Sequence, residues 1–160
     1  MQTSPNRTAN QLTFEVLWWV FTFVLAALVV APIYTQVPDF PFYLPNFIYI
    51  IVAVTITRYL FFLDISWLRD KLVLQAAISL AVIPLIFWMG QWFNYFVIFF
   101  DENGPDILVK HLGNDRAKVM DTYMHIEYKF FGVWAIIAAL VTPFRLLYNA
   151  WVRYKNVGRK

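Results

Sequence analysis

The sequence contains no cysteine. This absence excludes disulfide frameworks, thiolate metal sites, iron–sulfur clusters and cysteine nucleophiles. Charge is also scarce, since only 14% of the 160 residues are Asp, Glu, Lys or Arg, whereas soluble domains contain about 25%. The five glycines are scattered, and they form no Gly-rich loop of the kind that binds phosphate. No spacing of Ser, His and Asp indicates a nucleophile elbow.

Apolar side chains are abundant instead: 61% of the residues are hydrophobic and 20% are aromatic. A chain this short cannot hide such a fraction from water. The composition therefore predicts an integral membrane protein, with the lipid bilayer as its first partner. No basic stretch with interleaved aromatic residues faces outward, so we expect no nucleic-acid partner. The two histidines lie outside every apolar run, which argues against a bis-His haem in the bilayer. The sequence leaves any cofactor unknown.

Four apolar stretches approach the roughly 20 residues that a helix needs to cross a bilayer. We expect a single membrane domain over 1–160, all-α and polytopic, with four transmembrane helices in an antiparallel bundle. The predicted spans are about 13–34, 45–64, 72–95 and 126–148.

Prolines and polar residues set the expected boundaries of these helices. Pro32 and Pro38 are expected to break the first helix, and Pro45 suits the first turn of the second. The first apolar run lacks an Ala-x-Ala-like cleavage site, so we interpret it as a retained helix and not as a cleaved signal. The third run, Leu72 to Phe100, has no charge and exceeds the bilayer thickness, so it must tilt, kink or extend into the interface.

A polar outer loop over about 101–125 separates the third and fourth spans. Pro105 is expected to begin a short helix in this loop, which Gly113 would end in the left-handed conformation. Asn114 or Asp115 is then expected to cap the helix that continues into the fourth span.

The distribution of Lys and Arg predicts a cytoplasmic N-terminus and a cytoplasmic C-terminus. With this orientation the outer side carries four cations, Lys110, Arg116, Lys118 and Lys129, and all other Lys and Arg residues lie on or near the inner side. The predicted location is the plasma membrane or a bacterial inner membrane.

Each predicted helix has one polar residue toward its cytoplasmic end: Glu15, Arg58, Gln75 and Arg145. A charge inside a membrane costs at least about 2.5 kcal/mol, so a partner is expected. A network at this level is typical of an ion, anion or lipid-headgroup site. A simpler interpretation, which we favour, is that Glu15 neutralises one arginine during assembly while the other arginine extends to the membrane surface.

A second polar group lies at the outer mouth of the fourth helix. Asp121 and His125 are four residues apart and share a helix face, whereas Glu127 points about 200° away from His125. Gln91 and Asn94 of the third helix are expected at a similar height. The group fits a metal or acid–base site in principle, but a metal needs three or four converging ligands. We therefore favour a solvated helix end and predict no metal site.

Small and aromatic residues indicate packing surfaces. Alanines four apart allow helices to approach closely, and such pairs occur at Ala27/Ala31, Ala77/Ala81 and Ala135/Ala139. The aromatic outer extension of the third helix, with Trp92 and Tyr95 as anchors, is expected to dock a partner on the outer side.

These patterns favour a small non-catalytic membrane subunit that assembles with or stabilises a larger complex, or that associates with itself. The first alternative is a small transporter, channel or lipid-binding bundle that uses the Glu/Arg network. The second alternative is a membrane enzyme with an outer-face Asp/His site. The absence of recognisable catalytic groups inclines the prediction away from an enzyme.

Overall fold

A computed structural model of the chain describes residues 5–157, which form helices and connections but no strand. Two short 3-10 helices, η1 (Leu63–Ile65) and η2 (Trp67–Asp70), connect the second and third long helices. Four of the helices are long and apolar enough to cross a membrane, which confirms the all-helical prediction. The long helices are α1 (Pro5–Gln36), α2 (Tyr43–Phe62), α3 (Leu72–Asn103) and α4 (Asn114–Val157).

The end of α1 differs from the prediction. Pro32 does not break the helix, which continues to Gln36 with Pro32 inside it. A proline inside a helix removes one backbone hydrogen bond. The last turn is held nonetheless, because Ile33 and Val37 are buried and the Val37 N–H donates to the Ile33 carbonyl over 2.8 Å.

The outer loop also differs from the prediction. The segment after Pro105 is a series of turns and not a short helix. Among the glycines of residues 5–157, only Gly104 has a positive φ, +87°, and its N–H donates to the Phe100 carbonyl where α3 ends. Gly113 therefore ends no helix and has no positive φ, contrary to the prediction. The fourth helix begins at Asn114, as predicted.

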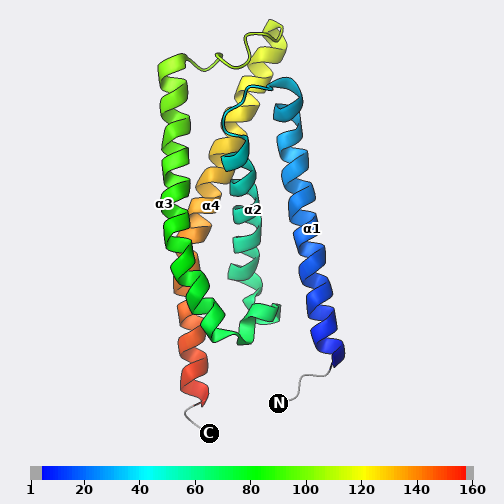
Figure 1. Cartoon of the computed structure of the whole chain (residues 1–160), viewed down its shortest axis with the longest axis vertical. Helices are drawn as coiled ribbons and strands as arrows, with labels where there is room; N and C mark the ends of the chain where they lie inside the picture. The colour runs from blue at the N-terminus through cyan, green and yellow to red at the C-terminus, as the bar shows by residue number, and fades with distance from the viewer. Residues whose placement is uncertain (1–4, 158–160) are drawn as a thin grey trace.

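The helices pack as a row. Packing is most extensive between α2 and α4 and between α4 and α3, and α1 packs mainly on α2. Figure 1 shows α1 and α3 at the two edges of this row. The start of α1 and the end of α4 lie at the same end of the molecule as the α2–α3 connection, and the other two connections lie at the opposite end. The edge helices therefore have the largest faces without a neighbour from the chain.

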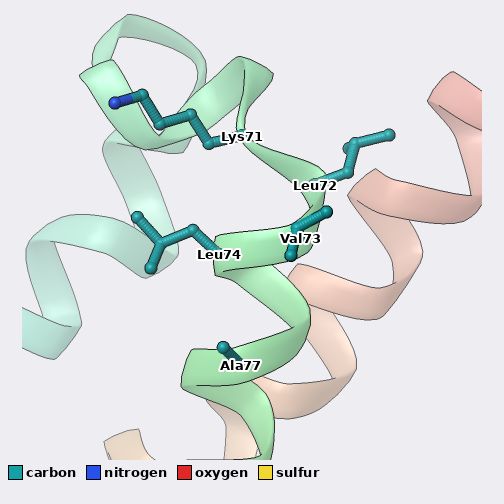
Figure 2. A pocket seen from close by; sticks show the side chains of 5 residues that line it. All are labelled: Lys71, Leu72, Val73, Leu74 and Ala77. Carbon is teal, nitrogen blue, oxygen red and sulfur yellow. The ribbon is translucent and has the colours of Figure 1, made fainter.

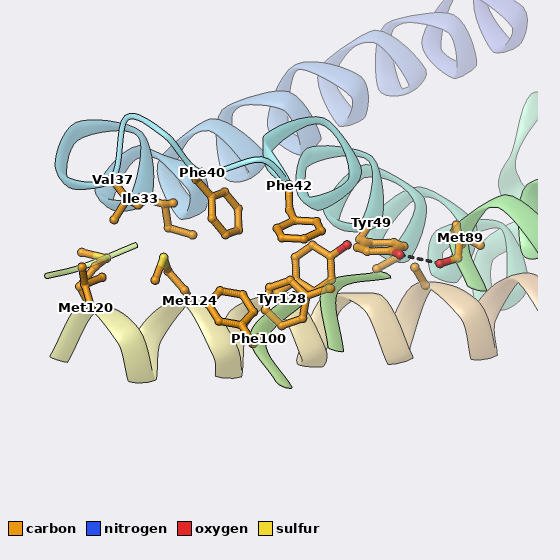
Figure 3. Close-up of a cluster of buried hydrophobic side chains, with 14 of the residues drawn as sticks. Ile33, Val37, Phe40, Phe42, Tyr49, Met89, Phe100, Met120, Met124 and Tyr128 are labelled. Carbon is orange, nitrogen blue, oxygen red and sulfur yellow. Dashed lines mark hydrogen bonds between the residues drawn. The ribbon is translucent and has the colours of Figure 1, made fainter. Parts of the chain in front are cut away.

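Aromatic side chains fill the core near the α1–α2 connection (Figure 3). The rings of Phe96 on α3 and Tyr128 on α4 stack with their centroids 3.9 Å apart and their planes 9° apart. Phe42, which is fully buried just before α2, contacts both of these rings. Met120 and Met124 extend the cluster along α4 toward α1. This cluster joins α3 and α4 to the start of α2.

Tyrosine hydroxyls connect the helices through backbone carbonyls. Tyr49 on α2 donates to the Met89 carbonyl of α3 over 2.6 Å, and Tyr123 on α4 donates to the Val29 carbonyl of α1 over 2.7 Å. The ring of Phe93 packs so closely on Gly132 of α4 that an added Cβ would lie 2.7 Å from it. The absence of a side chain at Gly132 therefore allows this close contact between α3 and α4.

Candidate functional site

Glu15 and Arg58 form a buried ion pair between α1 and α2. Arg58 donates from Nη1 to Glu15 Oε2 over 2.8 Å and from Nη2 to Glu15 Oε1 over 2.7 Å. Tyr59 donates a further hydrogen bond to Glu15 Oε2 over 3.2 Å. The exposed fractions of Glu15 and Arg58 are 5% and 3%. Two parallel bonds are the strongest geometry available to an arginine and a carboxylate, so this pair fixes α1 against α2.

Aromatic rings surround the guanidinium group of Arg58. Its central carbon lies 5.3 Å from the ring centroids of Phe14 and Trp18 and 5.4 Å from that of Tyr59. The negative faces of such rings attract a cation, more so when water is excluded. Arg58 is thus neutralised by Glu15 and enclosed by apolar side chains, and the pair offers little access to a soluble ligand.

A separate polar cluster joins α3, α4 and η2. Gln75 donates from Nε2 to the carbonyls of Leu68 and Arg69, over 2.8 and 2.9 Å. Its Oε1 accepts a hydrogen bond of 2.9 Å from Nδ2 of Asn149. Gln75 is fully buried and Asn149 is 8% exposed. The cluster therefore satisfies the carbonyl groups of the η2 turn inside the protein.

Arg145 lies at the surface of this end of the row. Its Nε donates to the Leu60 carbonyl over 3.3 Å, and its Nη2 lies 3.6 Å from Asp64 Oδ2. The side chains of Arg145 and Asp64 are 29% and 65% exposed. An ion pair this open to solvent contributes little to stability.

The four polar residues expected at one level do not form one network. Glu15 pairs with Arg58, Gln75 bonds to Asn149, and Arg145 reaches a backbone carbonyl. The reason is the row arrangement, which places α1 and α3 at opposite edges, too far apart for one shared cluster.

The outer-face residues do not converge either. His125 Nδ1 lies 3.1 Å from Asp121 Oδ1, and the imidazole packs on Phe100 with ring centroids 4.3 Å apart. Gln91 and Asn94 are exposed on α3. Within residues 5–157, no group of three or more His, Cys, Asp or Glu side chains is placed to hold a metal ion.

Glu127 is buried at the contact of α4 with α2, away from His125. Asn46 on α2 donates from Nδ2 to Glu127 Oε2 over 2.7 Å. The structure therefore does not bring Asp121, His125, Glu127, Gln91 and Asn94 together as one cluster. Sequence reasoning missed Asn46 because its position next to Pro45 indicates only the start of a helix.

The proposed docking residues Trp92 and Tyr95 differ in exposure. Trp92 is half-buried, with its ring near those of Phe42 and Trp88, whereas Tyr95 is 49% exposed. Both rings contact Phe42, so the start of α2 covers part of this surface. Tyr95 presents the larger free area, and Trp92 contributes to the chain's own packing.

An open hollow of about 580 Å³ lies at the start of α3. Figure 2 shows its lining, Lys71, Leu72, Val73, Leu74 and Ala77. Lys71 is charged, and its ammonium lies 4.2 Å from the centroid of the Trp67 ring.

Comparisons with protein-family models, curated proteins and solved structures find no match to this chain.

Proposed function

We propose that this chain is a small non-catalytic subunit that assembles with or stabilises a larger membrane protein complex. The proposal is based on two pairs of small residues that lie on the outward faces of the edge helices α1 and α3. Ala27/Ala31 on α1 and Ala77/Ala81 on α3 are exposed, away from the chain's other helices. Residues this small, one turn apart, let the backbone of a second helix approach closely.

The third pair supports this interpretation. Ala135 and Ala139 are fully buried inside the chain's own core. The chain thus already uses this pattern for internal packing, and the outward pairs offer the same surface to another helix. The edge helices also have most surface to offer, since only 22% of the most apolar stretch of α1 and of α3 is buried inside the chain, against 44% for α2.

The polar groups at the inner end favour a structural role over transport. Glu15 and Arg58 bind each other through two hydrogen bonds, and Gln75 is occupied by Asn149 and two carbonyls. A site for a transported ion or solute needs groups that are free to bind it, whereas these groups connect helices.

Leucine substitutions on the outward faces test the proposal. Ala27→Leu with Ala31→Leu, and separately Ala77→Leu with Ala81→Leu, should release most of the bound partner because the larger side chains hold the partner helix away. The matched controls are Val24→Leu and Ile83→Leu, which alter exposed positions on the same helices that are already large. The measurement is native mass spectrometry after extraction in mild detergent. A wild-type chain that carries neither a stoichiometric partner nor a second copy would show that the subunit proposal is wrong.

We also propose that the four helices run antiparallel, with both termini in the cytoplasm, in the plasma membrane or a bacterial inner membrane. The antiparallel arrangement is supported by the start of α1 and the end of α4, which lie at the same end of the molecule. The cytoplasmic location of that end is supported by the excess of Lys and Arg in the sequence on that side.

Single cysteines test the orientation cleanly, because the chain has none of its own. Asn103→Cys should react with a membrane-impermeant thiol reagent in intact cells, while Asn10→Cys and Lys155→Cys should react only after the cells are opened. All three positions are exposed, so burial does not limit labelling. Reaction at Asn10→Cys and not at Asn103→Cys in intact cells would reverse the orientation.

A further inference from the structure

Asn46 and Glu127 form a buried polar pair that the proposed subunit function does not use. Asn46 lies in the first turn of α2, and Glu127 lies just under one third of the way along α4. Asn46 is fully buried and Glu127 is 6% exposed. A single hydrogen bond of 2.7 Å, from Asn46 Nδ2 to Glu127 Oε2, joins them.

Each side chain also has one oxygen without a hydrogen-bond partner. Glu127 Oε1 and Asn46 Oδ1 are both buried and accept no hydrogen bond. An amide oxygen and an ionised carboxylate oxygen can only accept hydrogen bonds. A buried acceptor that is left unsatisfied costs about 1–3 kcal/mol, and more when it is charged. The ionised form of Glu127 thus leaves two acceptors and a negative charge without compensation.

In the part of the chain that the structure describes, no ion pair neutralises Glu127. Two phenols of α4, Tyr123 and Tyr128, lie near this carboxyl group, and the ring of Tyr49 on α2 packs on that of Tyr128. The hydroxyl of Tyr49 is already donated to the Met89 carbonyl. Glu127 therefore differs from Glu15, which has Arg58 as its counter-charge.

We propose that the Asn46–Glu127 pair is a proton-binding site, in which Glu127 holds a proton on Oε1 and donates it to Asn46 Oδ1. One proton then gives both oxygens the donor they lack. The carboxylic acid and the amide exchange two hydrogen bonds, and no net charge remains in the core. A metal ion fits the same place less well, because hard cations take about six or more oxygen ligands and this pair has two free oxygens.

The site has a structural consequence for the row of helices. The proton lies at the contact between α2 and α4, the most extensive helix contact in the chain. Removal of the proton places an unpaired carboxylate in that contact, which is strongly unfavourable in a medium of low dielectric constant. Proton occupancy and α2–α4 packing are therefore linked in this protein.

A hydrophobic carbodiimide, dicyclohexylcarbodiimide, tests the proposal in native membranes. It reacts with protonated carboxyl groups: the acid oxygen bonds to the central carbon, and the proton moves to a nitrogen. Transfer of the acyl group to nitrogen then gives a stable adduct that carries the whole reagent, with no oxidation or reduction. We expect one adduct at Glu127 by peptide mass spectrometry, with labelling that declines as the medium is made more alkaline.

Two variants serve as controls. Glu127→Gln should give no adduct but keep the thermal stability of the wild type, because two amides form the same pair of hydrogen bonds without a proton. Glu15 should stay unlabelled in the wild type, since its carboxylate is paired with Arg58. Glu15 should become labelled in Arg58→Leu, which shows that the reagent reaches buried acids in this chain.

Infrared spectroscopy measures the protonation of Glu127 independently, because it does not require the carbodiimide to reach the buried carboxyl group. The wild type should show a carbonyl stretch of a protonated carboxylic acid that Glu127→Gln lacks. Absence of this band at neutral pH would overturn the proposal. An unreactive Glu127, in a preparation in which Arg58→Leu does label at Glu15, would also overturn it. If sodium or calcium ions protected Glu127 from the carbodiimide at constant pH, the site would bind a metal ion and not a proton, and the proposal would be wrong.

Discussion

Glu15→Ala is expected to lower the stability of the folded chain by about 3–5 kcal/mol, the usual range for removal of one partner of a buried ion pair. The reason is that Arg58, only 3% exposed, would keep its charge inside the α1–α2 contact without a carboxylate. Phe14, Trp18 and Tyr59 offset part of this charge through their ring faces but accept no strong hydrogen bond from it. The measurement is the folded fraction during transfer from mild to denaturing detergent.

The double variant separates the ion pair from simple loss of packing. Glu15→Ala with Arg58→Leu removes both charges, so it should be more stable than either single variant. Arg145→Leu is the matched control on the neighbouring surface, where the contact with Asp64 is 3.6 Å and partly exposed. It should change stability by no more than about 1 kcal/mol. Additive losses in the double variant would show that Glu15 and Arg58 do not stabilise each other.

Phe42→Ala is expected to have the second large effect, about 3 kcal/mol, which is the lower end of the range for loss of a core phenylalanine. The lower end applies because the unfolded helices are also surrounded by apolar lipid, so the loss is mainly of packing contacts. Phe42 is fully buried and precedes α2 directly. Its ring lies within 6.5 Å of six aromatic rings of α3 and α4: Trp92, Tyr95, Phe96, Phe99, Phe100 and Tyr128.

Thermal unfolding in detergent measures this effect, and Phe61→Ala provides the control. Phe61 is on α2 as well but is 75% exposed, so its replacement should alter stability by no more than about 0.5 kcal/mol. Equal losses in both variants would mean that the cavity at Phe42 is filled by its neighbours. In that case the cluster does not hold the start of α2 against α3 and α4.

The existence of the helices was predictable for two reasons. Four apolar runs approach the length needed to cross a bilayer, and a helix satisfies its own backbone hydrogen bonds in lipid. The third helix begins at Leu72 as predicted, after the polar stretch that carries Arg69 and Lys71. Boundaries with proline were less predictable. Pro32 lies inside α1 because packing of Ile33 compensates for the lost hydrogen bond.

The candidate polar residues were partly predictable. Glu15 and Arg58 were identified because an uncompensated charge inside a span needs a partner, although Arg145 remained an equal choice in the sequence. Asn46 and Asn149 were missed because an uncharged amide near a helix end has an ordinary explanation as a cap or a solvated residue. Their roles appear only once Glu127 and Gln75 lie next to them.

By itself, the sequence determined that the chain is helical, apolar enough for a membrane and supplied with a few polar residues that need partners. These properties follow from composition and from order along one helix, which local physics decides. Only the tertiary structure decided which helices are neighbours: it placed α4 between α2 and α3, paired Glu15 with Arg58 and turned Glu127 toward Asn46. The physical reason is that four helices with similar apolar faces have many pairings of similar hydrophobicity. The choice among those pairings depends on close fits between side chains that are far apart in the sequence, such as Phe93 on Gly132.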